Sequence, residues 1–174
     1  MGIDPGTCTM GYGLIKETST KIYVLQYGTL KLNCYPSQTL KLQHIFKETL
    51  QILQEYKPNE IAFEAPFYGK NVQSMLKLGR AQGVAMAAAL MSEIPIIEYA
   101  PRKIKQAITG NGNATKEQVA YMLASILQLE NIPTQLDSSD ALAVAVCHIY
   151  QRKYPTKSKK DWTQAIKEGK LTIA

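Results

Sequence analysis

Residues 1–32 read MGIDPGTCTMGYGLIKETSTKIYVLQYGTLKL, and this stretch predicts how the fold begins. Gly2-Ile3-Asp4 has the character of a short first strand, and we expect a glycine-rich turn through Gly11 and Gly13 to lead into a second. The segment from Lys21 to Lys31 alternates enough to be a third strand. The N-terminus is therefore expected to form an antiparallel meander.

After the meander the pattern changes to helical spacing, which begins at Ser37 and ends at Lys57-Pro58-Asn59. The elements expected beyond it are a buried strand over 60–64, a helix over 71–91, a strand over 95–99, and helices from Pro101, Thr115 and Asp137. Strands followed by alternating helices and strands predict an α/β fold with a mixed sheet and helices on both faces. We expect one folded domain over 1–152 and a basic C-terminal tail over 153–174.

The composition is that of an ordinary globular domain, with 174 residues, 45% hydrophobic and 20% charged. No apolar stretch reaches the ~18 residues that a membrane span needs, and the N-terminus has no signal-peptide pattern, so a cytoplasmic protein is expected. The three cysteines are odd in number and widely spaced. They indicate free thiols rather than a disulfide framework or a zinc site.

The net charge of +6 is unevenly distributed. Residues 152–170 hold seven basic and two acidic side chains, which leaves the rest of the chain nearly neutral. A high isoelectric point is therefore weak evidence for nucleic-acid binding here, and local clusters must decide.

Four carboxylates stand at the ends of apolar elements. Asp4 follows the first strand, Glu64 interrupts an otherwise apolar run over 61–67, and Asp137 and Asp140 open an apolar helix. Each aspartate alone has an ordinary explanation, since Asp4 fits a turn, Asp137 an N-cap and Asp140 the helix dipole. None of these explains Glu64, because an unpaired carboxylate among apolar neighbours costs several kcal/mol.

Taken together, the four acids predict one oxygen-rich site for a hard divalent cation. Mg²⁺ is the expected cofactor, and Mn²⁺ is expected to substitute for it. Two ions are expected in each site, because two such ions ~4 Å apart promote phosphodiester cleavage. No histidine–cysteine set competes for zinc. We interpret His148 as a helix-end histidine and His44 as structural.

A cluster of basic residues lies between 102 and 116. Arg102, Lys103, Lys105 and Lys116 occur there without an acid, and Gly110-Asn111-Gly112-Asn113 offers backbone amides ahead of a helix. Thr115 and Gln118 have capping-box spacing, which puts Lys116 at the first helical position, against the helix dipole. A single lysine there is readily explained as solvated. The cluster as a whole favours contact with a phosphate backbone.

Two further features concern surfaces. Phe67, in the loop after Glu64, fits either an aromatic that stacks on unpaired bases or a core residue that closes the strand. The helix over 71–91 places Gly79, Gly83 and Ala87 four residues apart, which suits close packing against another subunit or against the sheet of the same chain.

Several motifs occur in register: GIDPG from Gly2, EAPF from Glu64, LKLG from Leu76, TGNG from Thr109 and DSSDALA from Asp137. With them the chain, from residue 2 to about 150, resembles RuvC-type Holliday-junction resolvases (crossover junction endodeoxyribonucleases). The resemblance implies a ribonuclease-H-like homodimer that makes paired nicks in four-way junction DNA during recombination and repair, with a branch-migration helicase complex as partner.

The resemblance also implies roles for individual residues. Asp4, Glu64, Asp137 and Asp140 correspond to the metal-binding acids, and Phe67 to the aromatic at the junction centre. Lys105 and Lys116, with Arg102 beside them, correspond to the DNA-contact region. Two alternatives stay open: an actin-like ATPase or sugar kinase, whose phosphate loop is similar to the segment over 2–7, and a junction-binding module without cleavage.

Overall fold

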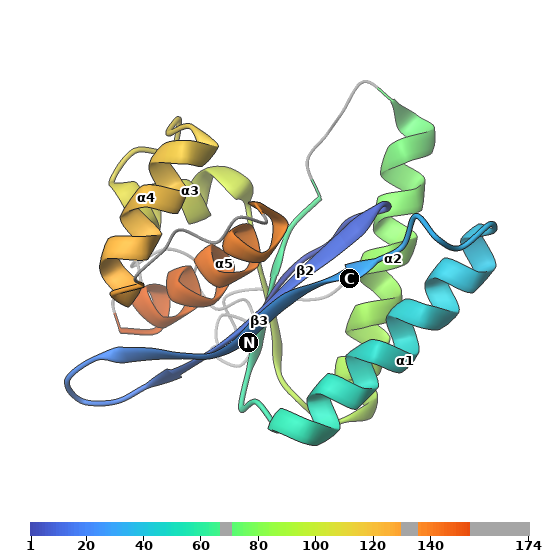
Figure 1. The fold of residues 1–174 in the computed structure, drawn as a ribbon, viewed down its shortest axis with the longest axis horizontal. Coiled ribbons are helices and arrows are strands. Elements are labelled where there is room, and N and C mark those ends of the chain that lie inside the picture. The colour runs from blue at the N-terminus through green and yellow to red at the C-terminus, as the bar shows by residue number, and fades with distance from the viewer. Residues whose placement is uncertain (67–70, 130–135, 154–174) are drawn as a thin grey trace, which may run out of the picture.

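The structure is a computed structural model that describes residues 1–66, 71–129 and 136–153. Five strands form one sheet in the order β3-β2-β1-β4-β5 (Figure 1). Their bounds are Gly2–Asp4 (β1), Thr9–Glu17 (β2), Ile22–Lys31 (β3), Ile61–Glu64 (β4) and Ile96–Tyr99 (β5). The first three strands pair antiparallel, whereas β4 joins β1 and β5 in parallel. The predicted meander and the α/β fold class are confirmed.

The glycine-rich turn was wrongly placed. Gly11 and Gly13 lie inside β2, and the connection from β1 runs through residues 5–8 instead. A Cβ atom on Gly13 would come within 2.8 Å of the Leu142 side chain. Glycine in a strand interior often marks such a close approach of another element, and at Gly13 it lets a helix lie flat on the sheet.

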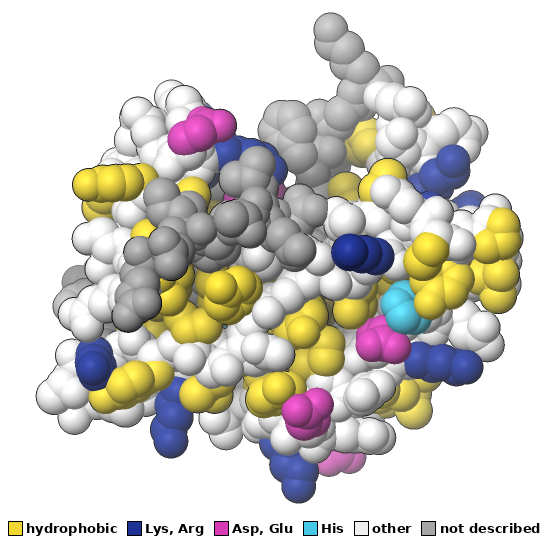
Figure 2. All heavy atoms as spheres, in the orientation of Figure 1, with side chains coloured by type: hydrophobic (Ala, Val, Ile, Leu, Met, Phe, Trp, Pro, Cys, Tyr) yellow, Lys and Arg dark blue, Asp and Glu magenta, His cyan; other side chains and the backbone are white. Residues whose placement is uncertain are grey.

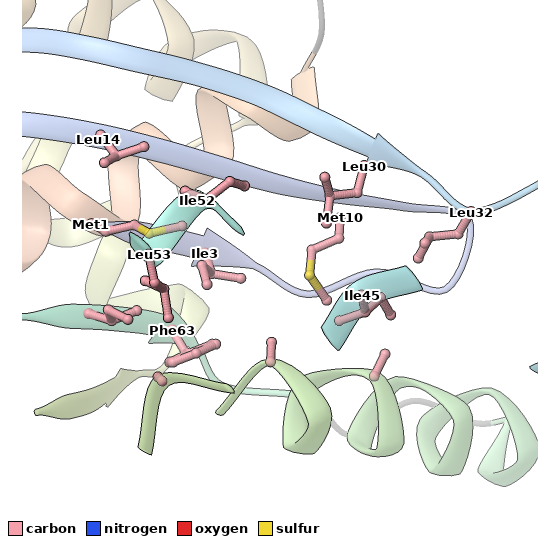
Figure 3. Packing of buried hydrophobic residues seen from close by; sticks show 14 residues of the cluster. Met1, Ile3, Met10, Leu14, Leu30, Leu32, Ile45, Ile52, Leu53 and Phe63 are labelled. Atoms are coloured by element: carbon pink, nitrogen blue, oxygen red, sulfur yellow. The ribbon is translucent and has the colours of Figure 1, made fainter. Parts of the chain in front are cut away.

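Helices cover both faces of the sheet (Figure 1). One face carries α1 (Gln38–Tyr56) and α2 (Val72–Met91), and the other carries α3 (Pro101–Thr109), α4 (Lys116–Leu127) and α5 (Leu136–Lys153). Figure 3 shows the core beneath α1 and α2, where Ile3, Met10 and Phe63 from the sheet meet Ile45 and Leu53. A second core lies under α5, whose residues 141–147 are all buried.

The helix ends follow the sequence signals. The side chains of Ser37, Asn71 and Thr115 cap α1, α2 and α4, and Thr115 forms the predicted capping box with Gln118. The N-cap alternative for Asp137 is wrong, because α5 already begins at Leu136 and places Asp137 within the first turn.

Other expectations from composition can be compared with the structure. No helix in the described ranges is long and apolar enough to cross a membrane. Cys8, Cys34 and Cys147 are free thiols, as predicted. Basic and acidic side chains are interspersed on the face in Figure 2, in keeping with a nearly neutral fold.

Candidate active site

Asp4 and Glu64 end two adjacent parallel strands. In the pairing of β1 with β4, Ile3 lies opposite Phe63, so Asp4 and Glu64 follow at equivalent positions. Ile3 and Phe63 point into the core under α1 and α2, and side chains alternate along a strand. The Asp4 and Glu64 side chains therefore point to the opposite face of the sheet, which α5 covers. Neighbouring strands lie ~4.8 Å apart, so the two carboxylates are close together.

The third acid comes from α5, which lies directly over β1. A Cβ atom on Gly2 would overlap the carbonyl oxygen of Ala141, so the backbones of strand and helix are in close contact. This packing brings Asp140 over the ends of β1 and β4. Asp4, Glu64 and Asp140 line one cavity of about 130 Å³, together with Lys105 and Lys116.

The charge state of Glu64 reflects this crowding. Burial, together with the nearby Asp140 carboxylate, raises the pKa of Glu64 from 4.5 to about 7, against the opposing effect of Lys116 and Lys105. A carboxylate disfavoured in its ionised form by burial and by a second acid is a common feature of functional sites. A cation bound in this cavity would relieve both causes.

Two lysines close the cavity from the side of α3 and α4. Lys116 Nζ lies 2.7 Å from Asp140 Oδ2, with the lysine side chain 56% exposed and the aspartate only 18%. Lys105 Nζ donates to the carbonyl of Ala114 at 2.8 Å, which ties α3 to the loop before α4. The sequence predicted a basic cluster here, but it gave no sign that Lys116 would pair with one of the acids.

The donor set fits a hard cation. The cavity is lined by the carboxylates of Asp4, Glu64 and Asp140, and Mg²⁺ prefers oxygen ligands of this kind. Among the side chains that the structure describes, however, no three of His, Cys, Asp and Glu stand close enough together to hold one ion. The Asp137 side chain lies outside those described, and the Lys116 ammonium already compensates Asp140.

The remaining predicted residues are placed as follows. Arg102 is exposed on α3 and packs its side chain against Gly112, where a Cβ atom would come within 2.6 Å of it. Phe67 lies outside the described residues. His44 is half-buried and within 2.9 Å of the Tyr35 hydroxyl, which supports a structural role. His148 does not line the cavity that holds the acids.

A larger cavity of about 360 Å³ lies at the other end of β1, with His148, Glu60 and Arg152 in its walls. Its acids, Glu17 and Glu60, are both paired with Arg152. We assign the functional site to the smaller cavity, because three carboxylates converge there and their crowding and burial raise the pKa of Glu64.

Comparison with known proteins identifies the family of the chain. The family described as Crossover junction endodeoxyribonuclease RuvC matches residues 1–148. The chain belongs to the RuvC family. A RuvC of Cytophaga hutchinsonii is 55% identical over 169 residues, which cover 97% of this chain and 84% of that protein. One of Christiangramia forsetii is 55% identical over 175 residues, covering 99% and 91%.

RuvC structures show the same fold. The Thermus thermophilus RuvC structure has a TM-score of 0.80 at 30% identity, covering 89% of this chain and 95% of that one. T. thermophilus RuvC in complex with a Holliday junction substrate gives a TM-score of 0.81 at 28% identity, with the same coverage. Membership of the RuvC family decides against the actin-like ATPase alternative.

Proposed function

We propose that this chain is a structure-specific endodeoxyribonuclease that resolves four-way (Holliday) junctions by paired, metal-dependent nicks in recombination and repair. The observation that carries the proposal is the parallel register of β1 and β4, which sets Asp4 beside Glu64 beneath Asp140. Two lysines on the same cavity wall supply positive charge for a phosphate. The family and the likeness to a junction-bound RuvC support it.

Four carboxylates would hold the metal: Asp4, Glu64, Asp137 and Asp140. Bound there, Mg²⁺ would activate a water and stabilise the leaving oxygen, two ions being the arrangement that suits phosphodiester cleavage. Mn²⁺ prefers the same oxygen donors and is expected to substitute. Lys116 would leave Asp140 once a cation compensates that carboxylate, which frees its ammonium for the DNA backbone.

The basic residues beside the cavity would hold the DNA. Lys105, fixed by the Ala114 carbonyl, and Arg102, packed on Gly112, stand on α3, while Lys116 begins α4. Charged contacts to phosphates position a duplex without reading its sequence. Phe67, three residues after Glu64 in the sequence, is proposed to stack on bases at the strand-exchange point.

Paired nicks on two symmetry-related strands need two active sites, so we propose a homodimer through α2. One side of α2 is apolar and open: Val72 is 65% exposed, Leu76 51% and Leu90 59%. Between them, Gly79 and Gly83 have no heavy atom within 4 Å of an added Cβ among the described residues. These glycines do not pack on the sheet, and exposed apolar surface of this kind marks an interface.

We propose further that the domain over 1–152 carries catalysis and that the basic tail over 153–174 strengthens DNA binding generally. A branch-migration helicase complex is the proposed partner, and the cytoplasm the proposed location.

Incubation of the protein with a synthetic four-way junction, labelled in turn on each strand, tests the proposed function. With Mg²⁺ we expect nicks at symmetric positions on two opposite strands, while a linear duplex of the same sequence stays uncut and a chelator stops the reaction. Tight junction binding without any nicking would contradict the proposal and would support the non-catalytic alternative.

A further inference from the structure

The C-terminal part of α5 is joined to the sheet by a chain of polar contacts outside the acid cavity. The Tyr99 hydroxyl lies 2.8 Å from His148 Nδ1, and His148 Nε2 lies 3.1 Å from Glu60 Oε2. Arg152 continues the chain, donating to Glu60 at 3.0 Å and to Glu17 at 2.6 Å. His148 is only 8% exposed, and both of its ring nitrogens are engaged in these contacts.

The protonation states in this chain are mutually consistent. Burial raises the pKa of Tyr99 to about 12, so its hydroxyl keeps the proton and donates to Nδ1. In the tautomer with the imidazole proton on Nε2, His148 accepts from the Tyr99 hydroxyl at Nδ1 and donates to Glu60. The pKa of Glu60 is lowered, because hydrogen bonds from His148 and Arg152 outweigh the opposing effect of burial. Each group thus has a matched donor or acceptor.

The contacts of His148 reach the two strands that frame Glu64. Tyr99 lies directly opposite Glu64 in the pairing of β4 with β5, and the amide of Ala65 donates to the Tyr99 carbonyl. Glu60 immediately precedes β4, which ends at Glu64. His148 therefore connects the helix that carries Asp140 to the strand that carries Glu64 and to that strand's neighbour.

Between these polar contacts, α5 packs on the sheet through small and apolar groups. The helix backbone at Ala141 and Ala145 lies against Gly2, and Leu142 lies against Gly13. Apolar packing is non-directional, so it sets the height of a helix above the sheet better than its position along its own axis. Hydrogen bonds with fixed geometry supply that second constraint.

We propose that His148 and Tyr99 are positioning residues that fix α5 along its axis and thereby set the position of Asp140 relative to Glu64. Eight residues of helix separate Asp140 from His148, a length of ~12 Å that transmits a displacement with little loss. Mg²⁺ demands near-ideal octahedral geometry at about 2.0–2.1 Å, so a small displacement of one carboxylate weakens its binding.

This inference rests on the proposed metal site. Groups that orient metal ligands from outside the site change metal affinity by roughly 10–100-fold when removed. Tyr99→Phe deletes one oxygen and leaves the ring, and we expect its affinity for Mn²⁺ to fall by about tenfold. Its maximal cleavage rate should recover at high metal concentration, because the acids themselves are intact.

The chain offers a matched control. Tyr35 and His44 form the same kind of hydrogen bond, 2.9 Å between the hydroxyl and Nδ1, at the start of α1 on the other face of the sheet. Tyr35→Phe removes an equivalent oxygen without touching α5. We expect it to lower the melting temperature to a similar extent and to leave Mn²⁺ affinity unchanged.

Calorimetric titration with Mn²⁺, without DNA, gives the decisive comparison across unmodified protein, Tyr99→Phe, His148→Gln and Tyr35→Phe. His148→Gln provides a second variant with a side-chain amide that still reaches Glu60, and we expect it to bind Mn²⁺ more weakly as well. Unmodified affinity in folded Tyr99→Phe and His148→Gln would overturn the positioning role. If the unmodified protein itself bound no Mn²⁺, the proposed metal site would fail instead, and the two results are distinguishable.

Discussion

The Lys116 ammonium lies 2.7 Å from Oδ2 of Asp140 and joins the first turn of α4 to α5 across the mouth of the acid cavity. The pair brings a DNA-contact candidate and a metal-ligand candidate into one interaction. While the Lys116 ammonium forms an ion pair with the Asp140 carboxylate, it cannot contribute its full charge to a phosphate contact. Its contribution to DNA binding should therefore depend on whether a cation has taken over Asp140.

The first prediction follows from this ion pair. In Ca²⁺, which also binds carboxylate oxygens, Lys116→Ala should reduce the salt dependence of junction affinity by about one counterion. In a chelator the reduction should be smaller. Lys105→Ala removes an ammonium that donates to the Ala114 carbonyl and is not paired with Asp140, so its effect on the salt slope should differ less between the two conditions.

Fluorescence anisotropy of a labelled junction over a range of salt concentrations measures these slopes. Lys47→Ala is the control, since Lys47 is exposed on α1, on the opposite face of the sheet. If the salt slopes of Lys116→Ala and Lys105→Ala match that of the unmodified protein, neither lysine contacts a DNA phosphate.

The second prediction concerns stability and pH. Glu64 has a pKa of about 7 in the fold against 4.5 unperturbed, so between these values the folded protein retains a proton that the unfolded chain releases. The free energy of unfolding must then fall as pH rises through this window. Without divalent ions, Glu64→Gln should stabilise the protein at pH 8 by on the order of 1–3 kcal/mol.

The stabilisation by Glu64→Gln should disappear below pH ~4.5, where Glu64 is protonated in both states. Thermal melts at several pH values in a chelator provide the measurement, with Glu93→Gln, an exposed carboxylate, as the control. A Glu64→Gln variant less stable than the unmodified protein at pH 8 would show that the carboxylate is well compensated in the absence of metal.

The third prediction separates the two interpretations of Phe67. If this side chain stacks on bases, Phe67→Ala should lose junction cleavage, with each lost stacking contact worth ~1–3 kcal/mol, and keep its melting temperature. If it closes the core, the melting temperature should fall by an amount typical of a buried aromatic. Thermal melts and cleavage assays on the same preparation decide between them.

The fourth prediction tests the dimer. Leucine at Gly83 should overpack whatever lies against that face, at a typical cost of ~1–3 kcal/mol. Because Gly83 is exposed and an added Cβ meets no described atom within 4 Å beyond its own helix backbone, Gly83→Leu should fold normally yet dissociate into monomers. Gln43→Leu places the same side chain at an exposed position of α1 and should leave the oligomeric state unchanged.

Light scattering at tens of micromolar reports the oligomeric state. Unmodified protein that is monomeric there, with full paired cleavage, would refute the α2 interface.

Local sequence signals predicted most of the fold. Three helices were predicted to begin at Ser37, at Asn71 and at Thr115, and in the structure the side chain of each of these residues caps its helix. The turn predicted through Gly11 and Gly13 was wrong because glycine marks both turns and close approaches, and at Gly13 it is Leu142 that lies close. That information is tertiary, since the residues are far apart in the chain.

The candidate site was predicted only in part, because some of its contacts join residues that are far apart in the chain. Acids at the ends of apolar elements predicted a site of Asp4, Glu64, Asp137 and Asp140. Three of them line a common cavity, and the Asp137 side chain lies outside those described. The pairing of Lys116 with Asp140 and the chain Tyr99–His148–Glu60 join residues 24 to 88 positions apart, and no periodicity encodes them. A polar Glu60 just before a buried strand was the one signal for that chain.

The most direct test of the metal-site account is single-turnover cleavage of a four-way junction by Glu64→Gln across a range of Mg²⁺ concentrations. The carboxylates are proposed to hold the metal that promotes cleavage, so the rate should fall by several orders of magnitude at every concentration while junction affinity stays unchanged. A folded Glu64→Gln variant that cleaves at the unmodified rate would contradict the account.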